Sequence, residues 1–242
     1  MQKIENKKYA AVVLSAGRGS RMGTEVPKQY LTLGGKPVIY YALNAFEQSR
    51  VQEIILVSGE EDVRYCQREI VEKYNFAKVR AVVPGGTERY HSVFCGLAEL
   101  EKSGGHPDYV MIHDGARPFV NQEIIKRCSE AVEREQACVA GMPVKDTIKI
   151  ANRDQFAVET PERSFVWQVQ TPQVFSYDLI NRAYKRLIER EEQGERISVT
   201  DDAMVLETIL NKQVYLVEGA YKNIKITTPE DLEMAEIFLK NG

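Results

Sequence analysis

The sequence predicts an α/β fold, a three-layer αβα sandwich with a mostly parallel sheet and a protruding antiparallel β-arm. Short apolar runs, typical of buried strands, alternate with longer segments of helical periodicity, and this alternation favours parallel strands joined by crossover helices. The alternation breaks at about residues 144–171, and this break predicts the arm. Because the 242 residues contain no internal repeat and no linker, we expect a single domain over residues 1–242.

The strands of the main sheet are expected at residues 9–13, 53–58, 79–83, 109–113, 138–142 and 214–217. Helices are expected from Pro37 onward, over residues 61–74, 92–100, 121–135, 177–192 and 201–210, and from Pro229 onward. The expected helix caps are Asn121, Thr200 and Thr228, with Pro229 in the first turn of the last helix, after a β-patterned stretch at 222–227. This order predicts a Rossmann-like domain, whose ligands bind beyond the carboxyl ends of the strands.

The predicted arm contains three short strand-like runs, at residues 147–150, 156–160 and 165–169, with turn residues between them. Trp167, the only tryptophan, lies in this segment. An arm of this size has little core of its own, so exposed apolar residues on it would favour a homodimer.

A glycine-rich loop follows the first strand, with the sequence Leu14-Ser15-Ala16-Gly17-Arg18-Gly19-Ser20-Arg21-Met22-Gly23 and then Pro27-Lys28-Gln29. Its glycines allow a tight turn that brings backbone N–H groups against an anion, and its arginines and lysine add positive charge. These features predict a triphosphate site. The loop lacks the P-loop pattern, and Met22 stands where a dinucleotide fingerprint has its third glycine. Ordinary turn chemistry is the alternative interpretation.

Further candidate residues follow other strands. Asp114, at the end of a strand, is a natural ligand for Mg²⁺, which binds one or two carboxylates together with phosphate oxygens, although Asp114 could instead only fix the turn. Arg117 can bind a phosphate through its forked guanidinium, and Lys225 could stabilise charge on an α-phosphate. The turn at Gly85-Gly86-Thr87-Glu88-Arg89 suits a flat base, although a helix-entry turn explains it almost as well.

Composition argues against several classes of protein. The net charge of −3 gives no reason to expect binding to nucleic acid or to an anionic membrane, and no apolar stretch is long enough to span a bilayer. The N-terminus lacks an apolar signal region, and the four cysteines are spaced like reduced core thiols, so a cytoplasmic protein is expected. The histidines form no metal-ligand spacing, and no serine-hydrolase elbow occurs.

Taken together, the motifs resemble one family, the 2-C-methyl-D-erythritol 4-phosphate cytidylyltransferases of the methylerythritol phosphate route to isoprenoids. The resemblance runs from about Ala10 to Leu239. It rests on the glycine-rich loop with Pro27-Lys-Gln, and on Gly85-Gly-Thr-Glu-Arg, His113-Asp-Gly-Ala-Arg-Pro-Phe, Pro143-Val-Lys-Asp-Thr, Gln170-Thr-Pro-Gln and Asn223-Ile-Lys-Ile-Thr.

The resemblance implies an enzyme that transfers CMP from CTP to 2-C-methyl-D-erythritol 4-phosphate with Mg²⁺ and releases pyrophosphate. It implies that Arg21, Lys28 and Lys225 are catalytic, and that Asp114 binds the metal or the substrate. The implied nucleotide-binding residues are Ser15, Ala16, Gly17, Gly19, Gly86, Thr87 and Ser92. The implied polyol phosphate contacts are Asp114, Arg117 and Thr171, with Thr147 and Arg163 from the neighbouring subunit of a homodimer, whose arm reaches across.

Two residues depart from the family pattern. Lys222 stands where some members have an acidic residue before Asn-Ile-Lys, which leaves open a second carboxylate for the metal. Thr87 stands where an acidic residue sometimes faces the cytosine, so backbone groups are expected to take more of the base selection.

Three alternative functions remain open at this point. Ribitol 5-phosphate cytidylyltransferase would use the same loop and cations with another acceptor. A non-catalytic nucleotide-binding protein of the same fold would be expected to lack Arg21, Lys28 or Lys225, and all three are present. A nicotinamide oxidoreductase is the most remote alternative.

Overall fold

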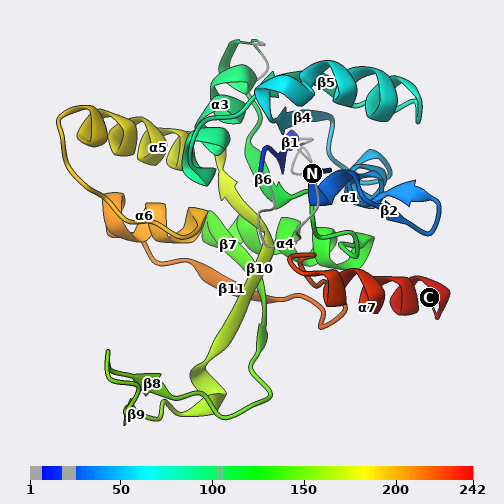
Figure 1. The fold of residues 1–242 in the computed structure, drawn as a ribbon. Coiled ribbons are helices and arrows are strands. Elements are labelled where there is room, and N and C mark those ends of the chain that lie inside the picture. Colours follow the sequence, from blue (N-terminus) through cyan, green and yellow to red (C-terminus); the bar gives the residue numbers. More distant parts are fainter. Residues whose placement is uncertain (1–6, 18–25, 103, 105, 242) are drawn as a thin grey trace, which may run out of the picture.

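The computed structural model describes residues 7–17, 26–102, 104 and 106–241. Within these residues, seven strands form one sheet in the order β11-β7-β10-β6-β1-β4-β5 (Figure 1). The strands are β1 (Tyr9–Ser15), β4 (Glu53–Ser58), β5 (Val79–Pro84), β6 (Tyr109–Asp114), β7 (Ala137–Pro143), β10 (Trp167–Ser176) and β11 (Tyr215–Glu218). All pairings are parallel except those of β10 with β6 and β7, which confirms the predicted fold class.

Helices cover both faces of this sheet and make the outer two layers. They are α1 (Val38–Glu47), α2 (Val63–Tyr65), α3 (Arg89–Lys102), α4 (Gln122–Glu135), α5 (Tyr177–Glu192), α6 (Asp202–Leu210) and α7 (Pro229–Lys240). The first face carries α1 and α4, and the opposite face carries α3 and α5, with α6 packed on α5. No helix in the described part of the chain has the length and apolar character needed to cross a membrane.

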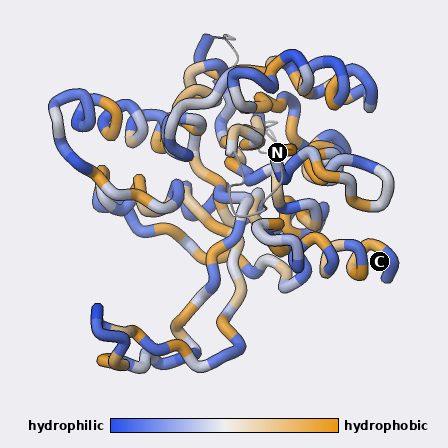
Figure 2. Tube along the Cα trace, in the orientation of Figure 1, coloured by the Kyte–Doolittle hydropathy of each residue, from blue (hydrophilic) through white to orange (hydrophobic). Residues whose placement is uncertain are grey.

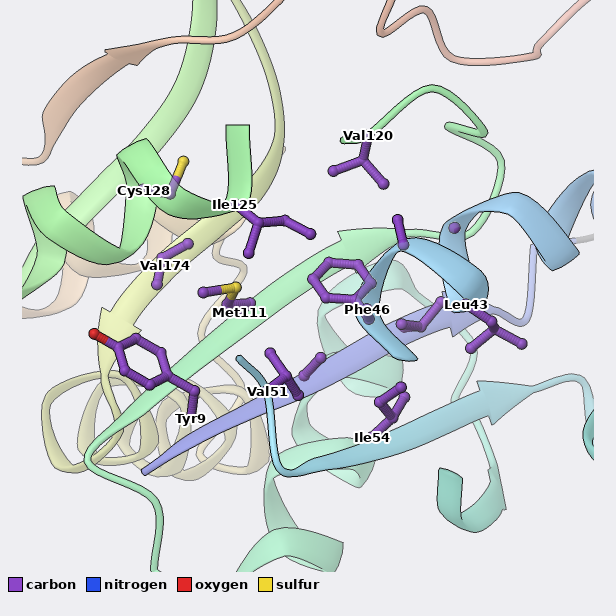
Figure 3. Close-up of a cluster of buried hydrophobic side chains, with 14 of the residues drawn as sticks. Tyr9, Leu43, Phe46, Val51, Ile54, Met111, Val120, Ile125, Cys128 and Val174 are labelled. Atoms are coloured by element: carbon purple, nitrogen blue, oxygen red, sulfur yellow. The ribbon is translucent and has the colours of Figure 1, made fainter. Parts of the chain in front are cut away.

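The core on the first face is a continuous cluster of buried side chains (Figure 3). Phe46 and Leu43 from α1, together with Met111 from β6, have no exposed surface, and Cys128 from α4 is equally buried. Cys66 and Cys138 are also buried and all four cysteines are free thiols, as predicted, although Cys95 is only partly covered. These contacts fix the strands whose carboxyl ends form the site.

The helix expected at residues 61–74 and the cap expected for α6 differ in detail from the structure. Residues 61–74 form a 3₁₀ turn (Glu60–Asp62), α2 and a π-helix (Cys66–Glu72) instead of one regular helix, and the wider π turn faces Cys66, Ile70 and Val71 to the core together. Thr200 is not the cap of α6. Asp201 is, because its Oδ1 accepts from the Met204 N–H at 2.9 Å.

Residues 222–227 form no strand, although their alternation suggested one. The Ile226 N–H donates to the Ala116 carbonyl at 2.9 Å, in the loop after β6, so this segment pairs with a loop rather than with the sheet. Asn121 and Thr228 cap α4 and α7 as expected. Their assignments hold because the Asn121 side chain accepts from the Ile124 N–H, and the Thr228 N–H is bound by Asp231.

The arm is present but is built differently from the expectation. Its two-stranded sheet pairs β8 (Ile150–Ala151) with β9 (Ala157–Glu159), so the run at 147–150 is strand only at its end. The run at 165–169 is strand only from Trp167, where β10 begins, and β10 continues to Ser176 between β6 and β7, whereas Phe165 ends a 3₁₀ turn. Pro172 would normally exclude a central strand, but it lies where the register between β10 and β7 shifts.

Helix α3 lies very close to the sheet at Gly96. A methyl group at Gly96 would lie 2.5 Å from Val12 Cγ1 and 3.1 Å from Val57 Cγ2. We therefore expect Gly96→Ala to lower the free energy of unfolding by about 1–3 kcal/mol, because overpacking outweighs the gain in helix propensity. Denaturant unfolding measures this change. A neutral or stabilising substitution would contradict the close packing of α3 on β1.

Candidate nucleotide-binding and active site

A pocket opens at the carboxyl ends of the parallel strands, where the sequence places the motifs. Its walls come from the end of β1, the turn before α3, the end of β6 and the segment before α7. The lining residues are Leu14, Ser15, Ala16, Gly17, Lys28, Gln29, Gly86, Thr87, Glu88, Arg89, Ser92, Asp114, Ala116 and Lys225. Motifs that lie as far apart in sequence as Leu14 and Lys225 therefore meet in one place, as the strand order requires.

Asp114 is the electrostatic centre of this pocket. Its Oδ2 lies 2.7 Å from Lys225 Nζ, its Oδ1 lies 3.2 Å from Arg89 Nε, and Arg117 Nε is 4.0 Å away. The side chain is only 11% exposed. Burial alone would raise the pKa of this carboxyl, but the neighbouring Arg89 and Lys225 hold it well below its usual range. Asp114 is therefore a fixed negative charge at neutral pH.

Arg89 also forms an ion pair with a second carboxylate, that of Asp202. Its two terminal nitrogens each lie 2.8 Å from an oxygen of Asp202, at the start of α6, and Asp202 has no exposed surface. The Tyr184 hydroxyl donates to the same carboxylate at 2.5 Å. Such a bidentate pair fixes the orientation of the guanidinium as well as its position. Arg89 thus connects α6 to the floor of the pocket.

The nucleotide-binding residues expected from sequence lie together. Ser15, Ala16, Gly17, Gly86, Thr87 and Ser92 all line the pocket. The turn approaches β1 so closely that a Cβ on Gly85 would lie 2.7 Å from the Ala16 Cβ. These six residues carry no charge, and we call the part of the pocket that they line the uncharged slot; Lys28, Arg89 and Lys225 are cations on the same pocket.

The triphosphate loop can be described only in part. Arg21 and Gly19 lie outside the described residues. Lys28 lines the pocket from the 3₁₀ turn Lys28–Tyr30, and Gln29 beside it is buried. The Gln29 amide donates to the Ser15 carbonyl and to the Gly17 carbonyl at 3.1 Å. These bonds fix the start of the loop, so Gln29 is a structural member of the site that residue type alone did not single out.

The residues expected to contact the polyol phosphate divide into two groups. Asp114, Arg117 and Thr171 are adjacent, because the Thr171 Oγ1 accepts from the Asp114 N–H at 3.1 Å and Arg117 lies within 4.0 Å of Asp114. Arg117 Nε is buried and has no hydrogen-bond partner among the described residues. Thr147 and Arg163 belong to the arm, which projects from the sheet (Figure 1). Both are exposed, and neither lines the pocket of its own chain.

His113 is completely buried beneath this group. Its Nδ1 is 3.0 Å from the Thr171 hydroxyl and its Nε2 is 3.2 Å from the Arg117 carbonyl. Burial lowers the pKa of His113 to about 4, so the ring is neutral at physiological pH. The imidazole positions Thr171 and the turn carrying Arg117, and it does not contribute a charge.

The donor set allows one carboxylate for a divalent metal. Among the described residues, no three side chains of the histidine, cysteine, aspartate or glutamate types come together as a metal site. Asp114 faces the pocket and suits Mg²⁺, which binds one or two carboxylates and takes its other ligands from phosphates and water. Lys222 supplies no second carboxylate, and its ammonium lies 5.8 Å from the ring of Phe238.

The fold and this site define the class of the protein. A Rossmann-like sheet carries, at the ends of its strands, Gly17 after β1, the cations Lys28, Arg89 and Lys225, and the buried Asp114, and a nucleotidyltransferase combines such features. Residues 9–241 match the family model of IspD, 2-C-methyl-D-erythritol 4-phosphate cytidylyltransferase. The chain belongs to this family, so it is an enzyme of the nucleotidyltransferase class, as predicted.

Individual relatives agree with the family assignment. The chain is 54% identical to 2-C-methyl-D-erythritol 4-phosphate cytidylyltransferase of Lachnospira eligens over 95% of this chain and 98% of that protein. The crystal structure of 4-diphosphocytidyl-2C-methyl-D-erythritol synthase from Anaerococcus prevotii superposes with a TM-score of 0.84 at 33% identity, covering 98% of both chains. The Thermus thermophilus 2-C-methyl-D-erythritol 4-phosphate cytidylyltransferase superposes with a TM-score of 0.73 at 28% identity, covering 96% of this chain and 99% of its own.

The neutral His113 predicts a pH dependence of stability. Its pKa is about 4 in the folded chain and about 6.5 when unfolded, so the unfolded state binds more protons between these values and stability falls as the pH falls through this window. We expect His113 to account for a loss of about 3 kcal/mol between pH 6.5 and pH 4.

Denaturant unfolding at several pH values measures this loss. His113→Gln should flatten the profile above pH 4, whereas His106→Gln, at an exposed position, should leave it unchanged. An equally steep profile for His113→Gln and for the unsubstituted chain would contradict the assignment.

Proposed function

We propose that this chain transfers CMP from CTP to 2-C-methyl-D-erythritol 4-phosphate and releases pyrophosphate, in the non-mevalonate route to isoprenoids. Family membership over nearly the whole chain supports the reaction. The observation that carries the proposal in the structure is the cluster of Arg89, Arg117 and Lys225 around Asp114, with Lys28 on the same pocket. Such a cluster binds the phosphates of two substrates in one place.

In this reaction the nucleophile is a phosphate oxygen of the acceptor, which is ionised at neutral pH. It forms a bond to the α-phosphorus of CTP while the bond from that phosphorus to the bridging oxygen breaks and pyrophosphate leaves. No general base is needed, which agrees with a buried and neutral His113. The chemistry needs in-line positioning and positive charge on the phosphates, and Lys28, Lys225 and Arg21 are proposed to supply that charge.

The proposed substrate positions follow from charge. CTP places its phosphates beside the cations of the pocket and its base in the uncharged slot beside Ala16 and Gly86. Asp114 is proposed to bind Mg²⁺, which would neutralise charge on the phosphates as they react. Arg117 and Thr171 are proposed to bind the phosphate of the acceptor, because Arg117 retains an unpartnered Nε among the described residues.

The acceptor is tested by a pyrophosphate-release assay with CTP. We expect turnover with 2-C-methyl-D-erythritol 4-phosphate and little with ribitol 5-phosphate, which would serve the alternative cytidylyltransferase. Turnover with ribitol 5-phosphate alone would overturn the proposed acceptor. Binding of NADH without binding of CTP would instead revive an oxidoreductase.

Lys28 provides the most direct test of the catalytic cations. We expect Lys28→Ala to lower kcat by about 10²- to 10³-fold, because it removes positive charge at the reacting phosphate. The thermal midpoint should stay unchanged, since Lys28 lies on the pocket surface rather than in the core. Lys126→Ala, a matched loss of charge on the exposed side of α4, should keep full turnover. Near-normal turnover of Lys28→Ala would remove Lys28 from the catalytic group.

We further propose one nucleotidyltransferase domain over residues 1–242, with the arm at about 144–171 inserted for dimerisation. The arm exposes large apolar side chains that its small sheet cannot bury, among them Phe165 at 78%, Phe156 at 71% and Val158 at 62% exposed. Figure 2 shows these hydrophobic stretches on the projecting arm. A second copy of the chain would cover them, and its pocket would receive Thr147 and Arg163.

Sedimentation velocity tests this dimer. We expect the unsubstituted chain to sediment as a dimer and Phe165→Asp to shift it toward the monomer, because a buried unpaired charge opposes association. Met234→Asp, at an exposed apolar position on α7, is the matched control and should leave the dimer intact. An active monomer of the unsubstituted chain would contradict the proposal.

A cytoplasmic location is also proposed, and the four free thiols support it.

A further inference from the structure

The hydrogen-bond donors of the turn beside the uncharged slot are bonded to other groups of the protein. The Gly85 N–H donates to the Ser58 carbonyl at 2.8 Å, and the Gly86 N–H donates to Ser92 Oγ at 3.2 Å. The Ser92 hydroxyl in turn donates to the Glu88 carbonyl at 3.3 Å. These three donors are therefore committed to the protein and are not directed at a ligand in the slot.

Thr87, on the same turn, is connected to α5 through His91. The Thr87 Oγ1 lies 3.0 Å from His91 Nδ1, and His91 Nε2 lies 2.7 Å from Glu191 Oε2. The Tyr90 hydroxyl donates to the other oxygen of Glu191 at 2.5 Å. The bonds from Tyr90 and His91 lower the pKa of Glu191, so its carboxylate is ionised at neutral pH and can only accept.

These contacts fix the direction of each hydrogen bond. Because Glu191 only accepts, His91 Nε2 must carry the proton of that bond. The Glu88 backbone N–H donates to His91 Nδ1 at 3.3 Å, so Nδ1 carries no proton and is itself an acceptor. The Thr87 hydroxyl must then donate to Nδ1, and its oxygen offers only lone pairs to a ligand in the pocket.

We propose that Glu191 and His91 are positioning residues for base selection, because they make the Thr87 hydroxyl an acceptor that favours a 4-amino over a 4-oxo pyrimidine. The 4-amino group of cytosine donates hydrogen bonds, whereas the 4-oxygen of uracil accepts them. The inference rests on the proposed function, in which the base occupies the slot beside Gly86 and Thr87.

The test compares kcat/KM for CTP and UTP, with 2-C-methyl-D-erythritol 4-phosphate as acceptor. Thr87→Val should reduce the preference for CTP over UTP by about tenfold, since it removes the acceptor at nearly constant volume. His91→Phe should reduce the preference as well, because the freed hydroxyl can rotate and donate to uracil. The double substitution should match Thr87→Val alone, since His91 acts through Thr87.

Tyr90→Phe is the matched control. It removes the neighbouring bond to Glu191 and keeps the aromatic ring that packs on His91, so the CTP to UTP ratio should stay unchanged. The proposal is overturned if Thr87→Val leaves the ratio unchanged, or if His91→Phe lowers turnover of both nucleotides equally, as mere support of the turn would do. If His91→Phe does not fold, Glu191→Gln takes its place and should also reduce the preference for CTP, because it removes the fixed acceptor of His91 Nε2.

Calorimetric binding of CTP and UTP without acceptor separates this inference from the reaction. A chain that binds CTP over UTP with the expected variant pattern, but transfers nothing to the polyol phosphate, would retain the base selection and lose the proposed reaction. Transfer of CMP with a ratio that no variant alters would retain the reaction and lose the roles of His91 and Glu191.

Discussion

The charge of Asp114 is the constraint on which the site depends. A carboxylate buried in a pocket is tolerated only when cations compensate it, and Arg89 pairs with one oxygen of Asp114 while Lys225 pairs with the other. Arg89, which is itself partly buried, also pairs with Asp202 at the start of α6. The chain of charges from Asp202 through Arg89 and Asp114 to Lys225 therefore links α6, α3, β6 and the segment before α7. Loss of Arg89 would leave the fully buried carboxylate of Asp202 without its cation.

This arrangement also prepares the pocket for phosphate. Cations that are already oriented by protein carboxylates need little reorganisation when charge develops on a reacting phosphate. The cations outnumber the carboxylates that face them, since Lys28 and Arg117 are present in addition to Arg89 and Lys225. The neutral His113 below contributes no charge of its own and only fixes Thr171 and the Arg117 turn. The buried polar groups of this site therefore hold cations in place and do not transfer protons.

Local patterns predicted the sheet and the location of the site, because apolar runs and glycine turns are local signals. They failed where tertiary contacts decide. Pro172 hid a central strand, since its place at a register shift depends on β7. The pairing of Arg89 with Asp202 joins residues separated by 113 positions, and no local sequence pattern predicts it. The spacing of the histidines in the sequence indicates no role for His91. Its contacts with Thr87 and Glu191 arise from the packing of α3 against the end of α5.

The continuity of β10 bears on how the arm can work. The strand begins at Trp167 in the arm and ends at Ser176 in the middle of the sheet, so one strand carries both the base of the arm and Thr171 in the site. The pairing of residues 167–169 with β7 sets the direction of the arm, and two residues further along the same strand Thr171 accepts from the Asp114 N–H. Because Arg163 and Thr147 do not line the pocket of their own chain, a role for them in binding the acceptor requires the pocket of a second copy. In such a dimer, the sheet of one chain would position groups in the site of the other, and arm and site would have to be preserved together.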